Sequence, residues 1–407
     1  MRIVIAGAGV AGGIIASALR TMPELEVICL ESTGPDHHSH AGNGLNIGPN
    51  ALRAVDMVYP ETGAALREVS LPWTRWMARL GDGSEIYHTP LNAVADRSGV
   101  RIRWSELYRT VRAGAGDAIR YTTSCAGFER NPDGRLKVHA LRKADGVTDV
   151  IDNVDLLIGS DGRYSALRAE HCGTPEPRHL GVTNFRALVD DHGDIDVQDM
   201  EQWFNGPRRL IAFRLPDGLI YVSGNLPIEP GAPTPEHYLD PAFLRTAYID
   251  GFDHPDPRLD ALSAVFAASA PAMHWARAQE IEPLFHDESR RLLFVGDAAH
   301  AMCPTLGQGA TQAIEDAAAF IALIREALAQ RRLEPALLCS AFAHLRAERV
   351  RFVKELSWDA SDTLVFGADP VEANLRKADP AFKARLTELY NNVPVGREQV
   401  RAALALF

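Results

Sequence analysis

Asp297 closes a short apolar segment in the run from Leu292 to Ala317, which reads LLFVGDAAHAMCPTLGQGATQAIEDA. A carboxylate in this place accepts hydrogen bonds from hydroxyl groups. The free N–H groups of a helix that begins near Gly309 favour negative charge, because a helix N-terminus carries a partial positive charge. A hydroxylated chain joined to an electron-rich ring, such as the ribityl chain and ring of a flavin, needs both groups.

Gly7, Gly9 and Gly12 form the pattern GxGxxG near the start of the chain. Such glycines allow a tight turn, close approach of the backbone to a pyrophosphate, and close packing of a helix on a strand. Glu31 follows about 20 residues later, where a carboxylate accepts hydrogen bonds from ribose hydroxyls and repels a 2′-phosphate. The sequence therefore predicts a bound FAD or NAD rather than NADP in this unit.

Asp161 and Gly162 form a second acidic turn within GSDGRYSALR, residues 159–168. An apolar strand is predicted before this turn, over 154–158, and a helix is predicted after it. Taken alone, the segment is equally well explained as a tight Asp-Gly turn with exposed arginines.

The elements that must position these groups follow from the hydrophobic pattern. Apolar runs at 2–6 and 26–30 flank residues 10–19, whose apolar positions have helical spacing, and this predicts a β-turn-α-β unit. From 178 to 284, short apolar and aromatic segments alternate with Pro and Gly, which is typical of an antiparallel sheet. Helices are predicted from Ala310 to the C-terminus, broken near Pro370, Pro380 and Pro394.

These elements predict an α/β protein in which a Rossmann-like FAD-binding domain carries an inserted, mostly antiparallel β-sheet substrate domain and C-terminal helices. The chain length of 407 residues also favours more than one domain. The predicted boundaries are 1–177 with 285–345 for the discontinuous FAD-binding domain, 178–284 for the sheet, and 346–407 for the helical region.

The composition, 46% hydrophobic and 23% charged, is that of a soluble globular protein. A formal net charge of −11 argues against a nucleic-acid partner, which would need a basic face. We read no signal peptide and no membrane-spanning run, so the cytoplasm is the expected location.

The five cysteines are scattered and lack CxxC spacing, so we expect reduced thiols, most of them buried. No HExxH or Cys/His ligand spacing is present, and no metal is expected. The cluster His37, His38 and His40 is more simply explained as a solvated loop than as a metal site.

The three motifs, at 7–12, 159–168 and 296–316, occur in an order that resembles the single-component FAD-dependent aromatic hydroxylases. This family of flavoprotein monooxygenases includes hydroxybenzoate, salicylate and hydroxynicotinate hydroxylases. The resemblance covers most of the chain. It implies an oxidoreductase of aromatic catabolism that uses FAD, NADH or NADPH, and dioxygen. Such an enzyme hydroxylates a small phenolic or hydroxypyridine-type ring through a flavin hydroperoxide.

The resemblance also implies which residues contact FAD, and they extend over the whole dinucleotide-binding domain. The ADP half would be held by Gly7, Gly9, Gly12 and Glu31, and the ribityl chain by Asp297. The flavin ring would be lined by Pro304, Gly307 and Gly309, and the family's second flavin-contacting loop resembles the segment with Gly42 and Gly44. A motif that the family associates with FAD and reduced nicotinamide together contains Asp161 and Gly162.

Two positions depart from the family's pattern. An arginine that touches FAD is usual in His-Arg-x-x-Leu, where this chain has Arg103 followed by Trp104. Either Arg103 substitutes from one residue away or the contact is lost. In hydroxynicotinate hydroxylases a histidine stands in place of Asn46, so its role as a base does not transfer, and Asn46 becomes a candidate substrate contact.

The substrate side is less specific in the sequence. Tyr221 and His300 are candidate catalytic groups by location, with a structural role as the alternative for each. Arg186 and Arg214, on predicted strands, are candidates to pair with a substrate carboxylate, although strand arginines usually point to solvent. We expect Glu315 and Asp316 to begin a solvated or capping helix face, and Trp73 and Trp76 to be core or pocket wall.

Other enzyme classes fit less well. A flavin-dependent halogenase shares the fold, but its Trp-x-Trp-x-Ile-Pro segment is absent, and a disulfide reductase is disfavoured by the lack of CxxC. A flavin-binding or NAD-binding module without catalysis is a further alternative. The expected partners are a small aromatic substrate and dioxygen, with a homodimer as a possible assembly.

Overall fold

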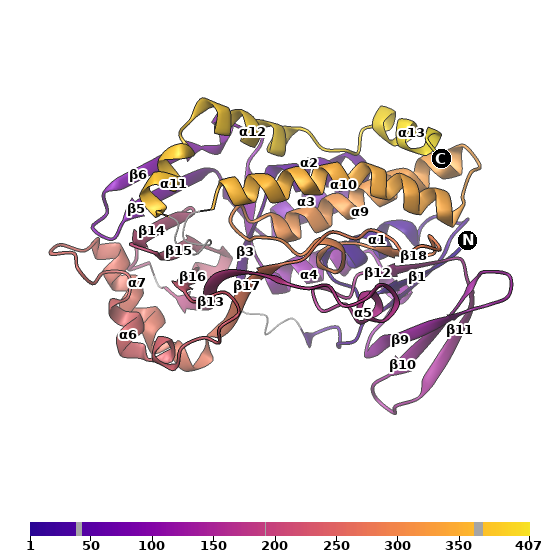
Figure 1. Ribbon diagram of the computed structural model, residues 1–407, viewed down its shortest axis with the longest axis horizontal. Helices are drawn as coiled ribbons and strands as arrows, with labels where there is room; N and C mark the ends of the chain where they lie inside the picture. The colour runs from indigo at the N-terminus through magenta and orange to yellow at the C-terminus, as the bar shows by residue number, and fades with distance from the viewer. Residues whose placement is uncertain (38–42, 192, 362–368) are drawn as a thin grey trace.

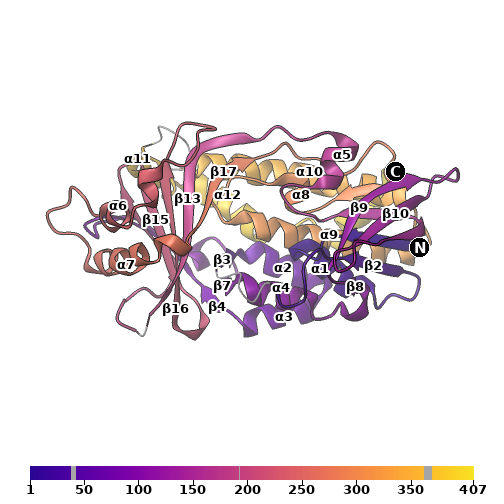
Figure 2. The same ribbon diagram turned by 90° about the horizontal axis from the view of Figure 1, so that it is seen from below.

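The computed structural model describes residues 1–37, 43–191, 193–361 and 369–407. A parallel sheet lies at one end of the molecule and a larger, mainly antiparallel sheet lies at the other (Figure 1). Long helices of the C-terminal half run between the two ends, and both chain termini lie beside the parallel sheet (Figure 2). Gly42 and part of the histidine cluster lie outside the described residues.

The parallel sheet has the strand order β18-β12-β1-β2-β8. Its strands are β1 (Arg2–Ala6), β2 (Glu26–Leu30), β8 (Ile119–Arg120), β12 (Leu156–Gly159) and β18 (Leu292–Phe294). Ala6 pairs with Gly159, and Gly159 pairs with Phe294, so β1, β12 and β18 end at one level. This register brings the three sequence motifs to the same edge of the sheet.

Helix α1 (Val10–Leu19) crosses between β1 and β2, and all three elements have the predicted bounds. Other elements of the N-terminal half surround this unit. They are the antiparallel group β9 (Thr123–Arg130), β10 (Leu136–Arg142) and β11 (Thr148–Val154), the small sheet of β3 (Gly44–Ile47), β4 (Leu71–Trp73) and β7 (Gly99–Arg103), and the helices α2 (Pro49–Val58), α3 (Pro60–Glu68), α4 (Trp104–Arg112) and α5 (Ala166–Cys172).

The larger sheet has the strand order β17-β13-β16-β15-β14-β5-β6. The predicted insertion supplies β13 (Arg178–Asp190), β14 (Glu201–Asn205), β15 (Arg208–Arg214), β16 (Leu219–Pro227) and β17 (His274–Glu280). Two strands that precede the insertion, β5 (Arg75–Leu80) and β6 (Glu85–Pro90), extend the sheet beyond its predicted limits. Their addition gives β14 a partner that it would lack as an edge strand.

Side chains on alternate positions of the sheet have different surroundings. Phe185, Leu210 and Val222 are buried against helices α6 (Pro241–Thr246) and α7 (Pro257–Ala268). Because successive side chains of a strand point to opposite faces, the residues between them face the interior of the molecule. The helices therefore stabilise one face of the sheet and leave the other available.

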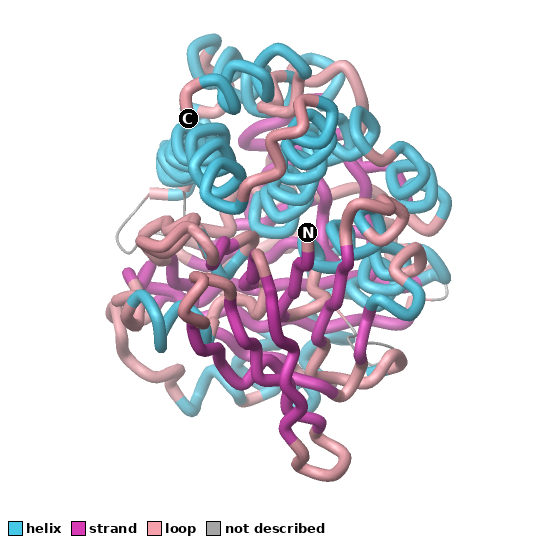
Figure 3. The backbone as a smooth tube through the Cα atoms, turned by 90° about the vertical axis from the view of Figure 1, so that its right-hand side faces the viewer, coloured by secondary structure: helices cyan, strands magenta, loops and turns pink. Residues whose placement is uncertain are grey.

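The C-terminal half is helical, as predicted. Its helices are α8 (Asp297–His300), α9 (Gln308–Ala329), α10 (Pro335–Asp359), α11 (Pro370–Arg376), α12 (Pro380–Asn391) and α13 (Arg397–Ala405). Pro370 and Pro380 begin helices, because a proline fits the first turn. The predicted boundary at 345/346 falls inside α10. Figure 3 shows many of the helices of the molecule gathered above the strands.

The cysteines are unpaired, and Cys29, Cys303 and Cys339 are buried, as expected for most of them. Within the described ranges, no group of three or more His, Cys, Asp or Glu side chains is arranged to hold a metal ion. In those same ranges, no helix has the length and apolar character needed to cross a membrane.

Candidate functional site

A cavity of about 380 Å³ extends from the carboxyl edge of the parallel sheet to the interior face of the larger sheet. Cavities of this size accept small ligands or part of a larger one. Many of the predicted FAD contacts line it. They are Gly9, Gly44, Gly162, Asp297, Pro304, Gly307 and Gly309.

The three glycines of the first motif differ in what a side chain at each position would contact. A Cβ at Gly12 would lie 2.1 Å from the Gly7 carbonyl oxygen, and a Cβ at Gly7 would lie 2.4 Å from the Ser160 carbonyl oxygen. A Cβ at Gly9 would approach no other group more closely than 3.7 Å. Protein packing thus requires Gly7 and Gly12, whereas the missing side chain of Gly9 leaves space in the cavity beside the N-terminus of α1.

Glu31 lies behind this turn and is buried. One carboxylate oxygen accepts the Ala8 N–H at 2.9 Å, and the other accepts the Thr33 N–H and hydroxyl at 2.9 and 2.7 Å. Burial alone would raise the pKa of Glu31, but the bonds from Thr33 and the charge of Arg112 lower it. The ionised carboxylate therefore supports the glycine turn from the end of β2.

Arg112, which the sequence did not single out, reaches the same place from α4. Its Nε donates to the Ala8 carbonyl at 2.6 Å, and its guanidinium lies 4.9 Å from the ring centre of Tyr108. Nη1 is buried and has no hydrogen-bond partner among the described residues. A positive group is thus held close to the N-terminus of α1, where an anionic ligand would be favoured.

Aromatic side chains line the cavity near Arg103, where the sequence suggested an arginine contact with FAD. Arg103 precedes the first residue of α4 and does not line the cavity, and its Nε is buried without a hydrogen-bond partner in the described parts of the chain. Trp104 and Tyr108 line the cavity and stack at 5.3 Å with an interplanar angle of 28°. Burial raises the pKa of Tyr108 to about 12, so this phenol remains protonated.

In the second motif, Asp161 lies just outside the cavity wall. Its Oδ2 is 3.4 Å from the Leu167 N–H at the start of α5. Gly162 and Arg163 line the cavity instead, and Arg163 Nη2 donates to the Gln279 carbonyl at 2.7 Å. The turn thus connects the floor of the cavity to β17 of the larger sheet.

Asp297 is exposed to the cavity, and its carboxylate forms no hydrogen bond or ion pair with the described residues. It lies beside the loop that leads into α9, since a Cβ on Gly309 would be 3.9 Å from its Oδ1. Gly307 precedes α9 with φ of 63°, a left-handed conformation that favours glycine. A free carboxylate and a helix N-terminus therefore stand together, as a ribityl chain and flavin ring require.

His300 is not at the cavity, which corrects the expectation that it is catalytic. It is 1% exposed, and its Nε2 lies 2.7 Å from Asp316 Oδ2. The expectation of a solvated Glu315 and Asp316 is also wrong, because both side chains are fully buried and pair with Arg346. These charges lie within the core between α8, α9 and α10.

The interior face of the larger sheet forms the other wall. Tyr221 and Arg186 line the cavity, as the sequence suggested, and residues with the same side-chain direction accompany them. On β13 these are Asn184 and Arg186, on β16 they are Tyr221, Ser223 and Asn225, and on β15 they are Arg209, Ile211 and Phe213. The polar and charged groups thus form one continuous surface across three neighbouring strands.

This surface is positively charged. Arg186 is partly buried and has no ion-pair partner among the described residues, and Arg209 is 3% exposed. Arg277 on β17 also lines the cavity. Asp297 is the acidic residue among the described lining residues, and it belongs to the opposite, flavin-binding wall.

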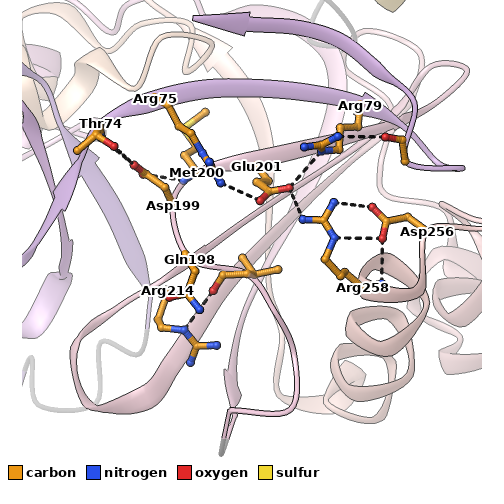
Figure 4. A network of polar contacts seen from close by, with 12 residues as sticks. Thr74, Arg75, Arg79, Gln198, Asp199, Met200, Glu201, Arg214, Asp256 and Arg258 are labelled. Atoms are coloured by element: carbon orange, nitrogen blue, oxygen red, sulfur yellow. Dashed lines mark hydrogen bonds and ion pairs between the residues drawn. The ribbon is translucent and has the colours of Figure 1, made fainter. Parts of the chain in front are cut away.

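Arg214 does not contribute to this charge, which corrects its assignment to the substrate. Its Nη2 donates to Asp191 at 2.6 Å and to the Ile195 carbonyl at 2.9 Å, and its Nε donates to the Val197 carbonyl at 3.1 Å. Its backbone N–H donates to the Gln198 carbonyl at 3.1 Å (Figure 4). Arg214 therefore holds the β13–β14 connection against β15.

Asn46 lies at the junction of the two walls. Its Nδ2 is 2.8 Å from the Met200 sulfur, and its Oδ1 is buried without a hydrogen-bond partner among the described residues. Nearby, a Cβ on Gly44 would lie 2.9 Å from the Tyr221 Cβ. Glycine at 44 thus permits the close approach of β3 to the larger sheet.

Trp76 completes the wall from β5, whereas Trp73 is core. The indole N–H of Trp76 donates to the hydroxyl of Tyr390 at 3.3 Å, and its ring packs edge-on to Trp73 at 4.9 Å. Tyr390 belongs to α12, so the C-terminal region supports a residue of the cavity wall.

Sequence reasoning missed Arg209, Asn184, Ser223 and Asn225. A period-two pattern was available, because polar residues alternate with buried apolar ones along β13 and β16. Arg112 and Tyr390 had no such signal, since each reaches the site through tertiary packing.

Comparisons with known proteins agree with this geometry. A family model described as an FAD binding domain matches residues 260–352. The chain is 27% identical to 3-amino-4-hydroxybenzoate 2-monooxygenase of Streptomyces platensis over 88% of its length and 86% of that protein. It is 26% identical to 6-hydroxynicotinate 3-monooxygenase of Pseudomonas fluorescens over 88% and 90%.

Among solved structures, that of Klebsiella pneumoniae HpxO complexed with FAD and uric acid is similar, with a TM-score of 0.72 and 21% identity. The match covers 100% of this chain and 96% of that chain. The fold is therefore shared over the whole length.

Proposed function

We propose that the chain, which is similar to FAD-dependent aromatic monooxygenases over most of its length, hydroxylates a small, activated aromatic substrate that carries an anionic group. One observation carries this proposal: a single cavity joins Asp297 and the N-terminus of α9 to a positively charged sheet face. The reaction consumes dioxygen, NAD(P)H and a proton, and it yields the hydroxylated ring, NAD(P)⁺ and water. FAD, when bound, passes the two electrons from the nicotinamide to dioxygen.

The residues along the cavity floor fit FAD. The open space at Gly9 and the N-terminus of α1 suit a pyrophosphate, and the unpaired carboxylate of Asp297 suits the ribityl hydroxyls. Pro304 and Gly307 line the part of the floor that would face the ring. The N-terminus of α9 stabilises negative charge there, because it carries about half a positive charge.

The opposite wall supports an anionic aromatic substrate. Arg186 and Arg209 stand on β13 and β15 with β16 between them and are offset by two residues along the strands, so their Cα atoms are about 12 Å apart at the usual strand spacing and rise. Arg209 Nη1 donates to Gln202 Oε1 of β14 at 3.4 Å, so the two guanidinium groups stand on opposite sides of the central strand β16. Guanidinium groups bind carboxylates through paired, charge-assisted hydrogen bonds.

The same positive charge favours the ionised form of a ring hydroxyl, which makes the ring electron-rich. We place Tyr221 as the hydrogen-bond partner of that hydroxyl, since it lines the cavity on the central strand of this face. Asn184 is a further candidate partner, because its Oδ1 is buried without a partner among the described residues.

Apolar side chains close the remaining walls. Trp76, Trp104, Phe213, Met200 and Met302 line the cavity. They limit the access of water, which would otherwise promote loss of peroxide without hydroxylation.

The test uses purified protein with FAD and matched pairs of phenols that differ by one carboxylate. We expect carboxylated phenols to stimulate NADH or NADPH oxidation, with oxygen uptake at the same rate. Stable FAD binding without stimulation by any activated arene would instead indicate a non-catalytic flavin-binding module. Preference for the neutral member of each pair would contradict the anion-binding role of the sheet.

A further inference from the structure

The Asp316 carboxylate contacts both ends of the short helix α8, which begins at Asp297. Its Oδ2 accepts the Gly296 backbone N–H at 2.7 Å, just before α8, and lies 2.7 Å from the Nε2 of His300, the last residue of α8. Its Oδ1 accepts Nε of Arg346 at 2.6 Å. One buried carboxylate therefore fixes the segment that presents Asp297 to the cavity.

We propose that Asp316 is a positioning residue for FAD, acting through Gly296 and His300 to hold Asp297 in its binding position. Gly296 has φ of 59° and ψ of −143°, a conformation that glycine adopts and other residues rarely do. A hydrogen bond from its N–H to a buried carboxylate is charge-assisted and stronger than one to a neutral acceptor.

The carboxylate of Asp316 is itself held ionised. Burial alone would raise its pKa, but His300 and Arg346 lower it. A buried charge is tolerated only when it is paired and hydrogen-bonded. Helix α10, which supplies Arg346, thereby supports a residue of the FAD site that it does not touch.

Hydrogen bonds from Arg168 restrain the α8 turn as well. Arg168 of α5 donates from Nη1 to the carbonyls of Ala298 and Ala299 at 3.0 and 2.8 Å. Charged side chains thus bond the N–H of Gly296 and the carbonyls of Ala298 and Ala299 in the α8 turn. We therefore expect the turn to be formed before FAD binds, which reduces the ordering that binding requires.

Glu315 provides a matched control in the adjacent position. It is as deeply buried as Asp316 and also pairs with Arg346, through Nη1 at 2.9 Å. Its other bonds go to Arg349, Asn50 and Gln312, and none of its printed contacts is to the α8 turn. The two carboxylates thus share an environment and differ in their contact with Gly296.

The experiment compares Asp316→Asn with Glu315→Gln. Both changes lower the melting temperature of the apoprotein, because each disturbs the same buried ion pairs. In Asp316→Asn, an amide NH₂ group replaces one carboxylate oxygen and cannot accept the hydrogen bonds that this oxygen accepted. We therefore expect FAD to bind about tenfold more weakly or worse, measured by flavin fluorescence titration. We expect FAD affinity within about twofold of wild type for Glu315→Gln. Equal FAD affinity in the two variants would overturn the proposal.

A second measurement applies if Asp316→Asn does not fold. Hydrogen exchange in the wild-type apoprotein should leave peptides covering 295–300 as protected as in the FAD-bound protein. Loss of that protection on removal of FAD would also overturn the proposal.

The inference rests on the proposed FAD contact of Asp297, and Asp297→Asn separates the two claims. If Asp297→Asn binds FAD normally, the proposed contact itself is wrong. If Asp297→Asn weakens FAD binding and Asp316→Asn does not, only the positioning role fails.

Discussion

Arg186 and Arg209 place positive charge inside a protein whose formal net charge is −11. Arginine in a strand was expected to face solvent by default, and the choice between Arg186 and Arg214 could not be made from sequence. The structure separates them because Arg214 is already bound to Asp191 at 2.6 Å, whereas Arg186 lines the cavity. Pairing of this kind depends on tertiary contacts that no local pattern records.

Arg186→Met should raise the KM for a carboxylated phenol by roughly 30-fold or more, since a charged hydrogen bond contributes about 2 kcal/mol. The kcat should change less, because the reacting ring atoms are not contacted by this group. Steady-state kinetics measure both. A phenol without the carboxylate is the control, and its KM should be nearly unchanged. An equal effect on both substrates would exclude carboxylate recognition by Arg186.

Asp297→Asn should weaken FAD binding by at least about tenfold, because an amide accepts hydrogen bonds from ribityl hydroxyls less strongly than a carboxylate does. Titration of the apoprotein with FAD measures the change. Asp117→Asn is the control, since Asp117 is 92% exposed and does not line the cavity. If both variants bind FAD alike, Asp297 is not a ligand of the ribityl chain.

At the scale of elements, local patterns predicted the glycine turn well. The bounds of β1, α1 and β2 agree with the predicted ones, because apolar spacing, a glycine turn and a closing carboxylate all point to one supersecondary unit. The start of α9 was predicted for the same reason. The buried side of α9 was not, because Glu315 and Asp316 are charged residues whose partners, Arg346 and His300, lie elsewhere in the sequence.

The glycine turn yields a paired prediction. Gly9→Ala should fold with a melting temperature close to wild type, because its Cβ would have no neighbour nearer than 3.7 Å, but it should bind FAD at least about tenfold more weakly by filling ligand space. Gly12→Ala should lower the melting temperature, because its Cβ would lie 2.1 Å from a backbone oxygen. Thermal melts and FAD titration distinguish these outcomes. Normal FAD affinity in Gly9→Ala would show that the ligand does not approach this turn.

The charges on α9 yield a pH dependence. Burial would raise the pKa of Glu315, but Arg349 and Arg346 bring it to about 2, below its usual value of 4.5. Between these values the unfolded chain binds a proton that the folded protein does not, so the free energy of unfolding falls as the pH falls through this window. Glu315→Gln should be less stable at neutral pH and should show a flatter acid limb. Denaturant unfolding at about pH 7 and about pH 4 measures this, and parallel profiles would contradict it.

At the scale of the whole molecule, the sequence predicted a discontinuous FAD-binding domain with an inserted sheet. It did not predict that β5 and β6 join that sheet. Charges explain the addition: Arg75 and Arg79 of β5 both reach the buried Glu201 of β14, at 3.1 and 3.4 Å, and Arg258 of α7 reaches it at 2.8 Å (Figure 4). Such ion pairs between residues far apart in the sequence form only when the fold brings the strands together.

The C-terminal region also reaches the cavity at this scale. Tyr390→Phe removes the hydroxyl that accepts the Trp76 N–H at 3.3 Å. Loss of one such bond, about 1 kcal/mol, should raise the substrate KM by roughly fivefold, with FAD affinity unchanged. Kinetics and FAD titration of the same preparation measure both. A change in FAD affinity without a change in KM would place the effect of α12 elsewhere.

The central claim is that one cavity serves both FAD and an anionic aromatic substrate, so that oxygen from dioxygen enters the ring. The most direct test is turnover of the FAD-bound protein with NAD(P)H and a carboxylated phenol under ¹⁸O₂, followed by mass spectrometry of the product. We predict that one ¹⁸O atom enters the product ring. An unlabelled product, or NAD(P)H oxidation that yields only peroxide with every activated carboxylated arene, would contradict the account.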